Sequence, residues 1–372
     1  MNPRECLLAT LRGEAVDRVP LMLESLWAPD KETIESWEDD PIRQEIALRI
    51  FDKTVYMLNI PSYTNRWGMI PSQAIEMVEE KEEGNQVLTT SRINTPQGPL
   101  TATVGYETGI RTGWTSKYPC ETLDDIEKIR SVEWELPEEL AAPSREDLPD
   151  DFEERGILRT SISSPMVCIG GMMSYQYYLQ LCILEFDLIN EMTAESMRRE
   201  LEILDVLLGP KLIEYVWMGG CEWLTPPMGS PQLYADLVQQ YEKPIIERIH
   251  AGQALSHIHC HGNVAGTIEQ VIERGADFFE PVEPPPDGDI TMADAQERTA
   301  GRMTLGGNVE FRLMANEDAD TVEQAVRAAF EGGKERLVLR TSAGPITTMT
   351  RSMGENYHRL IDVWEELSPI EA

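Results

Sequence analysis

Short apolar runs alternate with amphipathic segments along the chain, most regularly after residue 155. The runs have the length of single strands, and the segments between them space their apolar residues as helices do. Strands that alternate with helices form a parallel sheet covered by helices. Eight such runs predict an α/β fold, the TIM (β/α)8 barrel, with a doubly wound open sheet as the alternative. The expected strands are 19–24, 55–58, 157–163, 213–218, 255–259, 278–282, 303–305 and 337–339.

The first 150 residues follow a different pattern. Residues 1–18 are expected to form an opening helix, with Asn2 as its N-cap and Pro3 at its first position. Residues 65–115 are rich in Thr, Gly and β-branched residues, which predicts a β-meander inserted into the barrel or packed beside it. We expect residues 1–372 to form one barrel domain that carries this helical and β-rich N-terminal elaboration.

The composition excludes several classes of protein. Acidic residues outnumber basic ones by 65 to 32, a formal net charge of −33, and such a surface repels nucleic acid and anionic membranes. The 6 cysteines are scattered without a Cys-x-x-Cys pair, as in a reduced protein. There is no Gly-x-Ser-x-Gly motif and no P-loop, which argues against a serine hydrolase or a P-loop nucleotidase. The absence of a long apolar run or a signal peptide completes the prediction of a cytoplasmic protein.

Three of the 5 histidines lie in one short segment, His257-Ile258-His259-Cys260-His261. On a strand, residues two apart share a face, so the three imidazoles point one way while Ile258 and Cys260 point the other. Buried imidazoles need partners for both ring nitrogens, and they are good metal ligands. We therefore expect His259 and His261 to bind a metal, and His257, which lies deeper in the strand, to be a hydrogen-bonded core residue.

Acidic side chains at the neighbouring strand ends are the expected further ligands. Glu222, in a Gly-Gly-Cys-Glu segment, is predicted as a metal ligand or a general acid, against the alternative of a surface or helix-capping acid. Cys221 beside it is either a soft ligand or an inert core residue. Glu280 is a predicted metal ligand and Glu283 a predicted catalytic group at the end of another strand. Because they lie three residues apart, only one would face the barrel interior unless the prolines bend the chain.

Five segments spread over the chain form a further set of motifs: residues 2–20, 95–100, 259–262 and 306–309, and the helix start at 355–356. As a set, and in the order in which they occur, they resemble the uroporphyrinogen decarboxylase superfamily. The resemblance covers essentially the whole chain. It implies a TIM barrel, often a homodimer, with its active site in the mouth of the barrel.

The resemblance is closer to the cobalamin-dependent methyltransferases than to the true decarboxylases. True decarboxylases hold the propionates of their substrate with an Arg-Gln-Ala-Gly-Arg segment, whereas residues 23–30 here contain no arginine and are net acidic. The methyltransferases bind zinc through His-x-Cys on one strand and a distant Cys on the last strand. His259 matches this pattern, but His261 stands in place of the first cysteine and residues 341–344 contain none. A His/His/Glu site would still hold zinc or another divalent metal.

The resemblance implies a methyltransferase that moves a methyl group from a small methylated substrate, for example a methoxylated compound, to a corrinoid carried by a separate protein. Two alternatives remain open. One is a decarboxylase of a smaller carboxylate, for which Arg111 and Arg340 are the arginines expected near the mouth. The other is a barrel without catalytic activity that binds a corrinoid or a metabolite.

Overall fold

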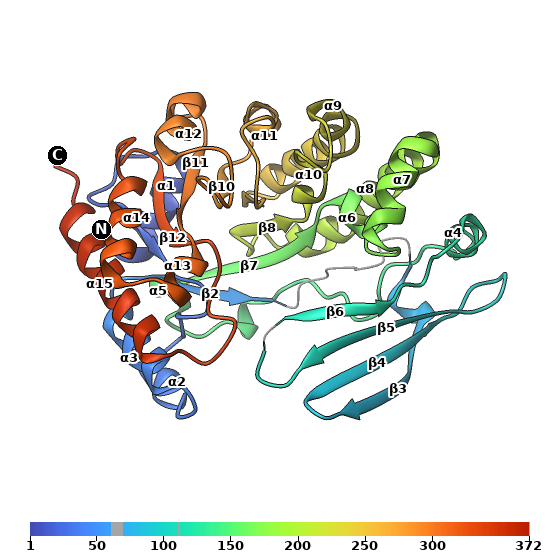
Figure 1. Ribbon diagram of the computed structural model, residues 1–372, viewed down its shortest axis with the longest axis horizontal. Helices are drawn as coiled ribbons and strands as arrows, with labels where there is room; N and C mark the ends of the chain where they lie inside the picture. The colour runs from blue at the N-terminus through green and yellow to red at the C-terminus, as the bar shows by residue number, and fades with distance from the viewer. Residues whose placement is uncertain (61–69, 111, 372) are drawn as a thin grey trace.

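A sheet of eight parallel strands curls into a TIM-like barrel in the computed structural model, which describes residues 1–60, 70–110 and 112–371 (Figure 1). The strands are β1 (Leu21–Met22), β2 (Tyr56–Asn59), β7 (Gly156–Ser163), β8 (Tyr215–Gly219), β9 (Leu255–His259), β10 (Phe278–Glu280), β11 (Thr304–Val309) and β12 (Leu337–Thr341). Their order in the sheet is β1-β12-β11-β10-β9-β8-β7-β2. The predicted barrel is therefore confirmed, and the open-sheet alternative is discarded.

Helices cover the outside of the barrel, and an apolar layer lies between them and the strands. Val216, Ile258 and Leu305 point outward from their strands and are buried in this layer, which supplies the main driving force for folding. Among the described residues, none of the helices combines the length and the apolar character that crossing a membrane requires. The helices are α1 (Pro3–Arg12), α2 (Lys31–Glu35), α3 (Pro41–Ile50), α4 (Leu123–Arg130), α5 (Phe152–Arg155), α6 (Pro165–Gly170), α7 (Tyr175–Leu184), α8 (Phe186–Leu208), α9 (Pro231–Tyr234), α10 (Gln240–Ala251), α11 (Ile268–Arg274), α12 (Met292–Thr299), α13 (Phe311–Asn316), α14 (Ala319–Ala329) and α15 (Arg351–Leu367).

Helix α1 packs against the amino ends of the barrel strands. Asn2 caps it as predicted, by accepting a hydrogen bond from the backbone of the third helical residue. The helix ends at Arg12, earlier than expected from the sequence, because Gly13 adopts the left-handed conformation (φ +73°) that terminates helices. Its apolar side chains, Leu7 among them, pack with Met57 and Phe278 of the strands. The helix thereby shields this apolar cluster of the barrel interior.

The predicted β-meander is a separate antiparallel sheet, inserted in sequence between β2 and β7. It lies at the lower right of Figure 1. Its strands pair in sequential order, as the short connections between them favour. They are β3 (Ile75–Glu83), β4 (Gln86–Ile93), β5 (Leu100–Glu107) and β6 (Gly113–Lys117).

A fully buried ion pair joins α10 to α11 on the outer side of the barrel. Glu242 and Arg274 each have 0% of the side chain exposed, and the guanidinium donates a hydrogen bond to the carboxylate. Arg274 also donates a hydrogen bond of 2.8 Å to the hydroxyl of Tyr234, at the end of α9. Two charges removed from water in this way are tolerated only as a pair, because either one alone loses its hydration without compensation.

We expect Arg274→Met to lower the free energy of unfolding by about 3–5 kcal/mol, because Glu242 is left buried without its partner. The double variant Glu242→Met/Arg274→Met removes both charges and should recover most of this loss. Urea unfolding followed by circular dichroism measures both values. If Arg274→Met were as stable as the wild type, the ion pair would not stabilise the packing of α10 against α11.

Candidate active site

Polar side chains gather at the carboxyl ends of β8 to β12. These five strands are neighbours in the sheet and run parallel, so their ends lie along one edge of the barrel. In TIM barrels this edge is where reactive groups converge. The side chains are Glu222 after β8, His259 and His261 on and after β9, Glu280 and Glu283 on and after β10, Glu310 after β11 and Ser342 after β12.

Glu280 is buried in the barrel interior, with 0% of its side chain exposed. Its Oε1 accepts hydrogen bonds from His257 Nε2 at 2.6 Å and His259 Nδ1 at 2.8 Å, and lies 3.2 Å from Arg340 Nη1. Burial alone would raise the pKa of this carboxyl group. The charge of Arg340 and the two imidazoles outweigh burial and hold the pKa of Glu280 well below its usual range, so it is an anion at neutral pH.

His257 is a core residue, as the sequence predicts. Its Nε2 donates to Glu280, and the hydroxyl of Tyr215 donates to its Nδ1. Burial lowers the pKa of His257 to about 4, so the ring is neutral at pH 7. Both of its nitrogens are occupied, which leaves His257 no atom to offer a metal.

His261 is held by Glu283. Its Nδ1 lies 2.7 Å from Glu283 Oε1, while Glu283 Oε2 accepts a hydrogen bond from the backbone of Gly262. Burial lowers the pKa of His261, but the hydrogen bond to Glu283 and the nearby carboxylates, including Glu222, outweigh burial and raise it. Strand β10 ends at Glu280, so the alternation of side chains between the two faces of a strand does not extend to Glu283. Both Glu280 and Glu283 therefore reach the histidines.

His259 and His261 are therefore oriented in the same way. Each uses Nδ1 to bond a buried carboxylate, which leaves Nε2 to face a metal or a substrate. Metal-binding histidines commonly have this arrangement, because a carboxylate on one nitrogen fixes the ring and makes the other nitrogen a better ligand. Glu280 and Glu283 here hold the histidines in place.

Among the described residues, one group of three potential metal ligands has all its ligand atoms within 4.8 Å of one another: Cys221, Glu222 and Cys260. Of the predicted ligands, Glu222 belongs to this group, whereas His259, His261 and Glu280 do not. Gly219 of β8 lies opposite His259 of β9, so the residues just past these two strand ends meet. Cys260 lies on the face away from the histidines, as alternation along the strand predicts, but it was not predicted as a ligand.

The local backbone positions this group. Gly220 has a φ of +109°, which favours glycine, and its N–H donates a 3.0 Å hydrogen bond to Glu222 Oε2. Both cysteines are buried, while Glu222 is partly exposed. A hydrogen bond with Cys221, together with burial, raises the pKa of the Cys260 thiol well above its usual value.

The donor set fits a zinc ion. Two thiolates and a carboxylate are zinc ligands, and three protein ligands leave one coordination position for a substrate. The buried thiols would have to release their protons to a metal, as cysteine ligands do. Residues Cys221, Glu222 and Cys260 could therefore hold zinc beside the histidine pair.

Two arginines inside the barrel are paired with carboxylates, and one of them, Arg159, was not predicted from the sequence. Arg340 contacts Glu280 and also donates a 3.3 Å hydrogen bond to Glu24. Arg159, which the apolar run of β7 obscures in the sequence, lies 3.5 Å from the other oxygen of Glu24. Both arginines are almost fully buried. Arg111, the other arginine considered for carboxylate binding, lies outside the described residues.

A cavity of about 450 Å³ lies between the β-meander and the barrel edge. It is lined by Trp114 of β6, Tyr118 after β6, Ser163 at the end of β7 and Trp223, which directly follows Glu222. The hydroxyl of Tyr175 donates a 2.6 Å hydrogen bond to the carbonyl of Trp223 and so fixes this wall. The cavity is the place next to Glu222 where a substrate could enter.

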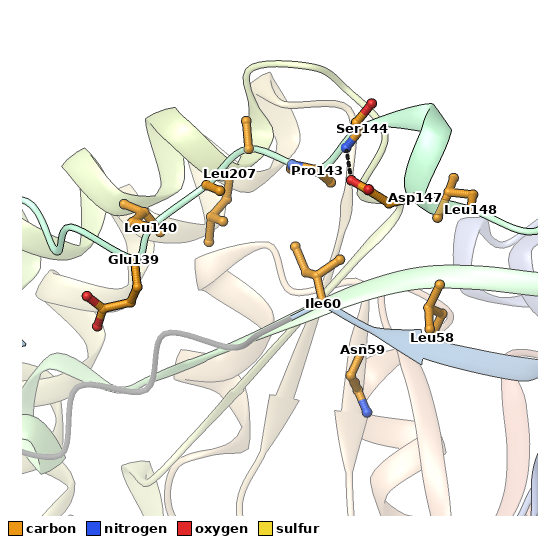
Figure 2. A pocket seen from close by; sticks show the side chains of 12 residues that line it. Leu58, Asn59, Ile60, Glu139, Leu140, Pro143, Ser144, Asp147, Leu148 and Leu207 are labelled. Carbon is orange, nitrogen blue, oxygen red and sulfur yellow. Dashed lines mark hydrogen bonds between the residues drawn. The ribbon is translucent and has the colours of Figure 1, made fainter.

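A second hollow, of about 460 Å³, has a different character. Figure 2 shows Leu58 and Ile60 on one side of it and Leu140 and Leu207 on the other. Of its two acids, Asp147 accepts a hydrogen bond from the backbone of Ser144, drawn in Figure 2, and Glu139 accepts one from a serine hydroxyl. None of the polar residues gathered at the carboxyl ends of β8 to β12 lines it. We therefore do not assign it to the active site.

Comparison with known proteins finds a family match for the C-terminal part of the chain, which begins just after Cys221 and Glu222. Residues 225–367 match the uroporphyrinogen decarboxylase (URO-D) family. This part of the chain is a URO-D family domain. It contains the ends of β9 to β12, and the strand-end glutamates after β10 and β11 lie within it. The resemblance drawn from the sequence is therefore confirmed.

Solved structures extend the comparison to the rest of the chain. A methyltransferase from Methanosarcina mazei has a TM-score of 0.61 at 15% identity, covering 98% of this chain and 99% of its own. A B12-independent methionine synthase from Shewanella sp. W3-18-1 has a TM-score of 0.44 at 10% identity, covering 79% and 76%. No curated protein matches. The first structure shows that this fold extends over the whole chain.

We expect the purified protein to bind about one zinc ion per chain, and Cys221→Ser or Cys260→Ser to weaken this binding by more than about 100-fold. Competition with a chromogenic chelator measures the affinity, and elemental analysis measures the content. Cys120→Ser, which replaces a buried cysteine outside the group, is the matched control. If the double variant Cys221→Ser/Cys260→Ser kept its metal while His259→Ala/His261→Ala lost it, the histidines would be the metal ligands.

Proposed function

We propose that this protein is a metal-dependent methyltransferase that moves a methyl group from a small methylated substrate to a corrinoid carried by a partner protein. The observation that carries the proposal is the group Cys221, Glu222 and Cys260 beside the carboxylate-held histidines, at the carboxyl edge of a URO-D-like barrel. This edge combines soft and hard metal ligands with general acids, which is what breaking a bond from a methyl group to oxygen or nitrogen requires.

In the proposed site, Cys221, Glu222 and Cys260 would hold the metal, which would supply Lewis-acid chemistry there. The cavity between the meander and the barrel edge holds the substrate, with Trp223 forming the wall nearest to Glu222. Glu283 fixes His261, whose raised pKa lets it donate a hydrogen bond to the substrate over a wider pH range. The partner would present its corrinoid at the open side of this cavity.

The alternative of a decarboxylase is less well supported. Binding a carboxylate substrate calls for cationic groups that are available to it. Among the described residues, Arg340 and Arg159 are the arginines in the barrel interior, and Glu280 and Glu24 already balance their charges. A substrate with several carboxylates would also be repelled by Glu222, Glu283 and the acidic surface. A methylated compound without multiple negative charges fits this environment better.

We expect the metal-loaded protein to transfer methyl groups to free cob(I)alamin, with Glu222→Gln slower by about 100-fold or more because it loses a ligand. The assay follows the cob(I)alamin absorbance under anaerobic conditions, with a panel of methoxylated compounds and methylated amines. Gln176→Ala, an exposed change on α7, serves as the control. Release of carbon dioxide from a small carboxylate without any methyl transfer would favour the decarboxylase. Corrinoid binding without turnover would favour the alternative of a barrel that binds a corrinoid and has no catalytic activity.

A further inference from the structure

Glu310 is a buried carboxyl group that none of these roles uses. It directly follows β11, and only 7% of its surface is exposed. Its Oε2 accepts a 3.0 Å hydrogen bond from the hydroxyl of Ser342, which follows β12. Its Oε1 is buried and, among the described residues, has no hydrogen-bond partner. Burying a charged carboxylate oxygen without a hydrogen-bond donor destabilises the folded state, and the protonated carboxyl group costs less because it carries no charge.

Several charged groups act on Glu310 from neighbouring elements. Glu283 and Asp287 follow β10, and His261 follows β9. Arg312 of α13 is the nearby cation, and it is bonded to Asp287. Burial is the largest influence and the charge of Glu283 the next, and together they raise the pKa of Glu310 to about 7. Ser342 and His261 act in the opposite direction.

The other acids at this edge are already engaged. Glu283 accepts hydrogen bonds on both oxygens, from His261 and from the backbone of Gly262. Glu222 accepts a hydrogen bond from Gly220 and belongs to the candidate metal group. Glu280 is bonded to two imidazoles and Arg340 through Oε1, and its Oε2, like Oε1 of Glu310, has no hydrogen-bond partner among the described residues. Arg340 and the imidazoles hold the pKa of Glu280 well below its usual range, however, so Glu280 has no proton to give at neutral pH. Among the strand-end acids, Glu310 combines an unpartnered oxygen with surroundings that contain no paired cation.

We propose that Glu310 is the general acid of this site and protonates the leaving group of the methylated substrate. The inference rests on the proposed methyl transfer. The bond between the methyl carbon and the substrate oxygen breaks, and the reduced corrinoid supplies the electron pair of the new bond to the methyl carbon. The oxygen keeps the electrons of the broken bond and takes the proton from Glu310. The carboxylate then recovers a proton from water before the next turnover.

The first test measures the proton itself and needs no substrate. Infrared difference spectra between the wild type and Glu310→Gln, recorded across the pH range, report the protonated carboxyl group. We expect its signal to disappear with a midpoint near pH 7. Glu283→Gln removes a negative charge and should move the midpoint down, whereas Ser342→Ala removes a donated hydrogen bond and should move it up. A wild-type midpoint at the ordinary value for glutamate would overturn the proposal.

The second test measures turnover. Because the protonated form is active, wild-type kcat for a methyl ether should fall as the pH rises through about 7. Glu310→Gln should lower kcat by about 10²–10⁴-fold and remove this fall. A quaternary ammonium substrate releases a neutral amine without needing a proton, so the variant should retain its rate with that substrate.

The outcomes separate this proposal from the proposed function. If the wild type transfers methyl groups and Glu310→Gln does so equally fast from an ether, Glu310 is not the acid while the methyltransferase stands. If the wild type transfers no methyl group from any substrate, the proposed function is wrong and this role is wrong with it.

Discussion

The barrel depends on the pairing of Glu280, a carboxylate with no exposure to solvent. An isolated charge in that place would cost several kcal/mol, so its partners determine whether the strands can close around it. Glu280 of β10 bonds two histidines of β9 and contacts Arg340 of β12. Arg340 reaches Glu24 beyond β1, and Glu24 pairs with Arg159 of β7. With His257 neutral, two carboxylates meet two guanidinium groups, and this balanced network ties strands from both halves of the sheet together.

Strand β9 presents different chemistry on its two faces. His257 and His259 face the interior, where Glu280 fixes their rings, whereas Cys260 faces the outer layer and meets Cys221. His259 and Cys260 are consecutive residues, so a metal bound by the cysteines and a substrate bound near the histidines would lie close together. Glu222 connects the two sets, because its charge acts on His261 and its carboxylate lies with the cysteines.

The sequence was sufficient to predict the eight strands, the meander and the cap of the first helix, because each of them depends on a local pattern of residues. It also separated the faces of β9, because alternation on a strand is geometric. It could not pair Cys221 with Cys260, which are far apart in the chain and meet only because β8 and β9 are adjacent. It did not predict Arg159, which lies in an apolar run and whose burial depends on its pairing with Glu24 and its hydrogen bond to Asn59. The spacing of Glu280 and Glu283 predicted opposite faces, but the strand ends between them.

The carboxyl groups at the barrel edge differ in environment, and this difference assigns their chemistry. Glu280 is more deeply buried than Glu310, yet cations and imidazole donors keep it ionised. Glu310 is buried next to another acid, with a single hydroxyl to help it, and its pKa is raised to about 7. Acid and base roles commonly separate where neighbouring environments push pKa values apart. One glutamate therefore serves as a permanent anion that orients histidines, while the other can hold and release a proton near neutral pH.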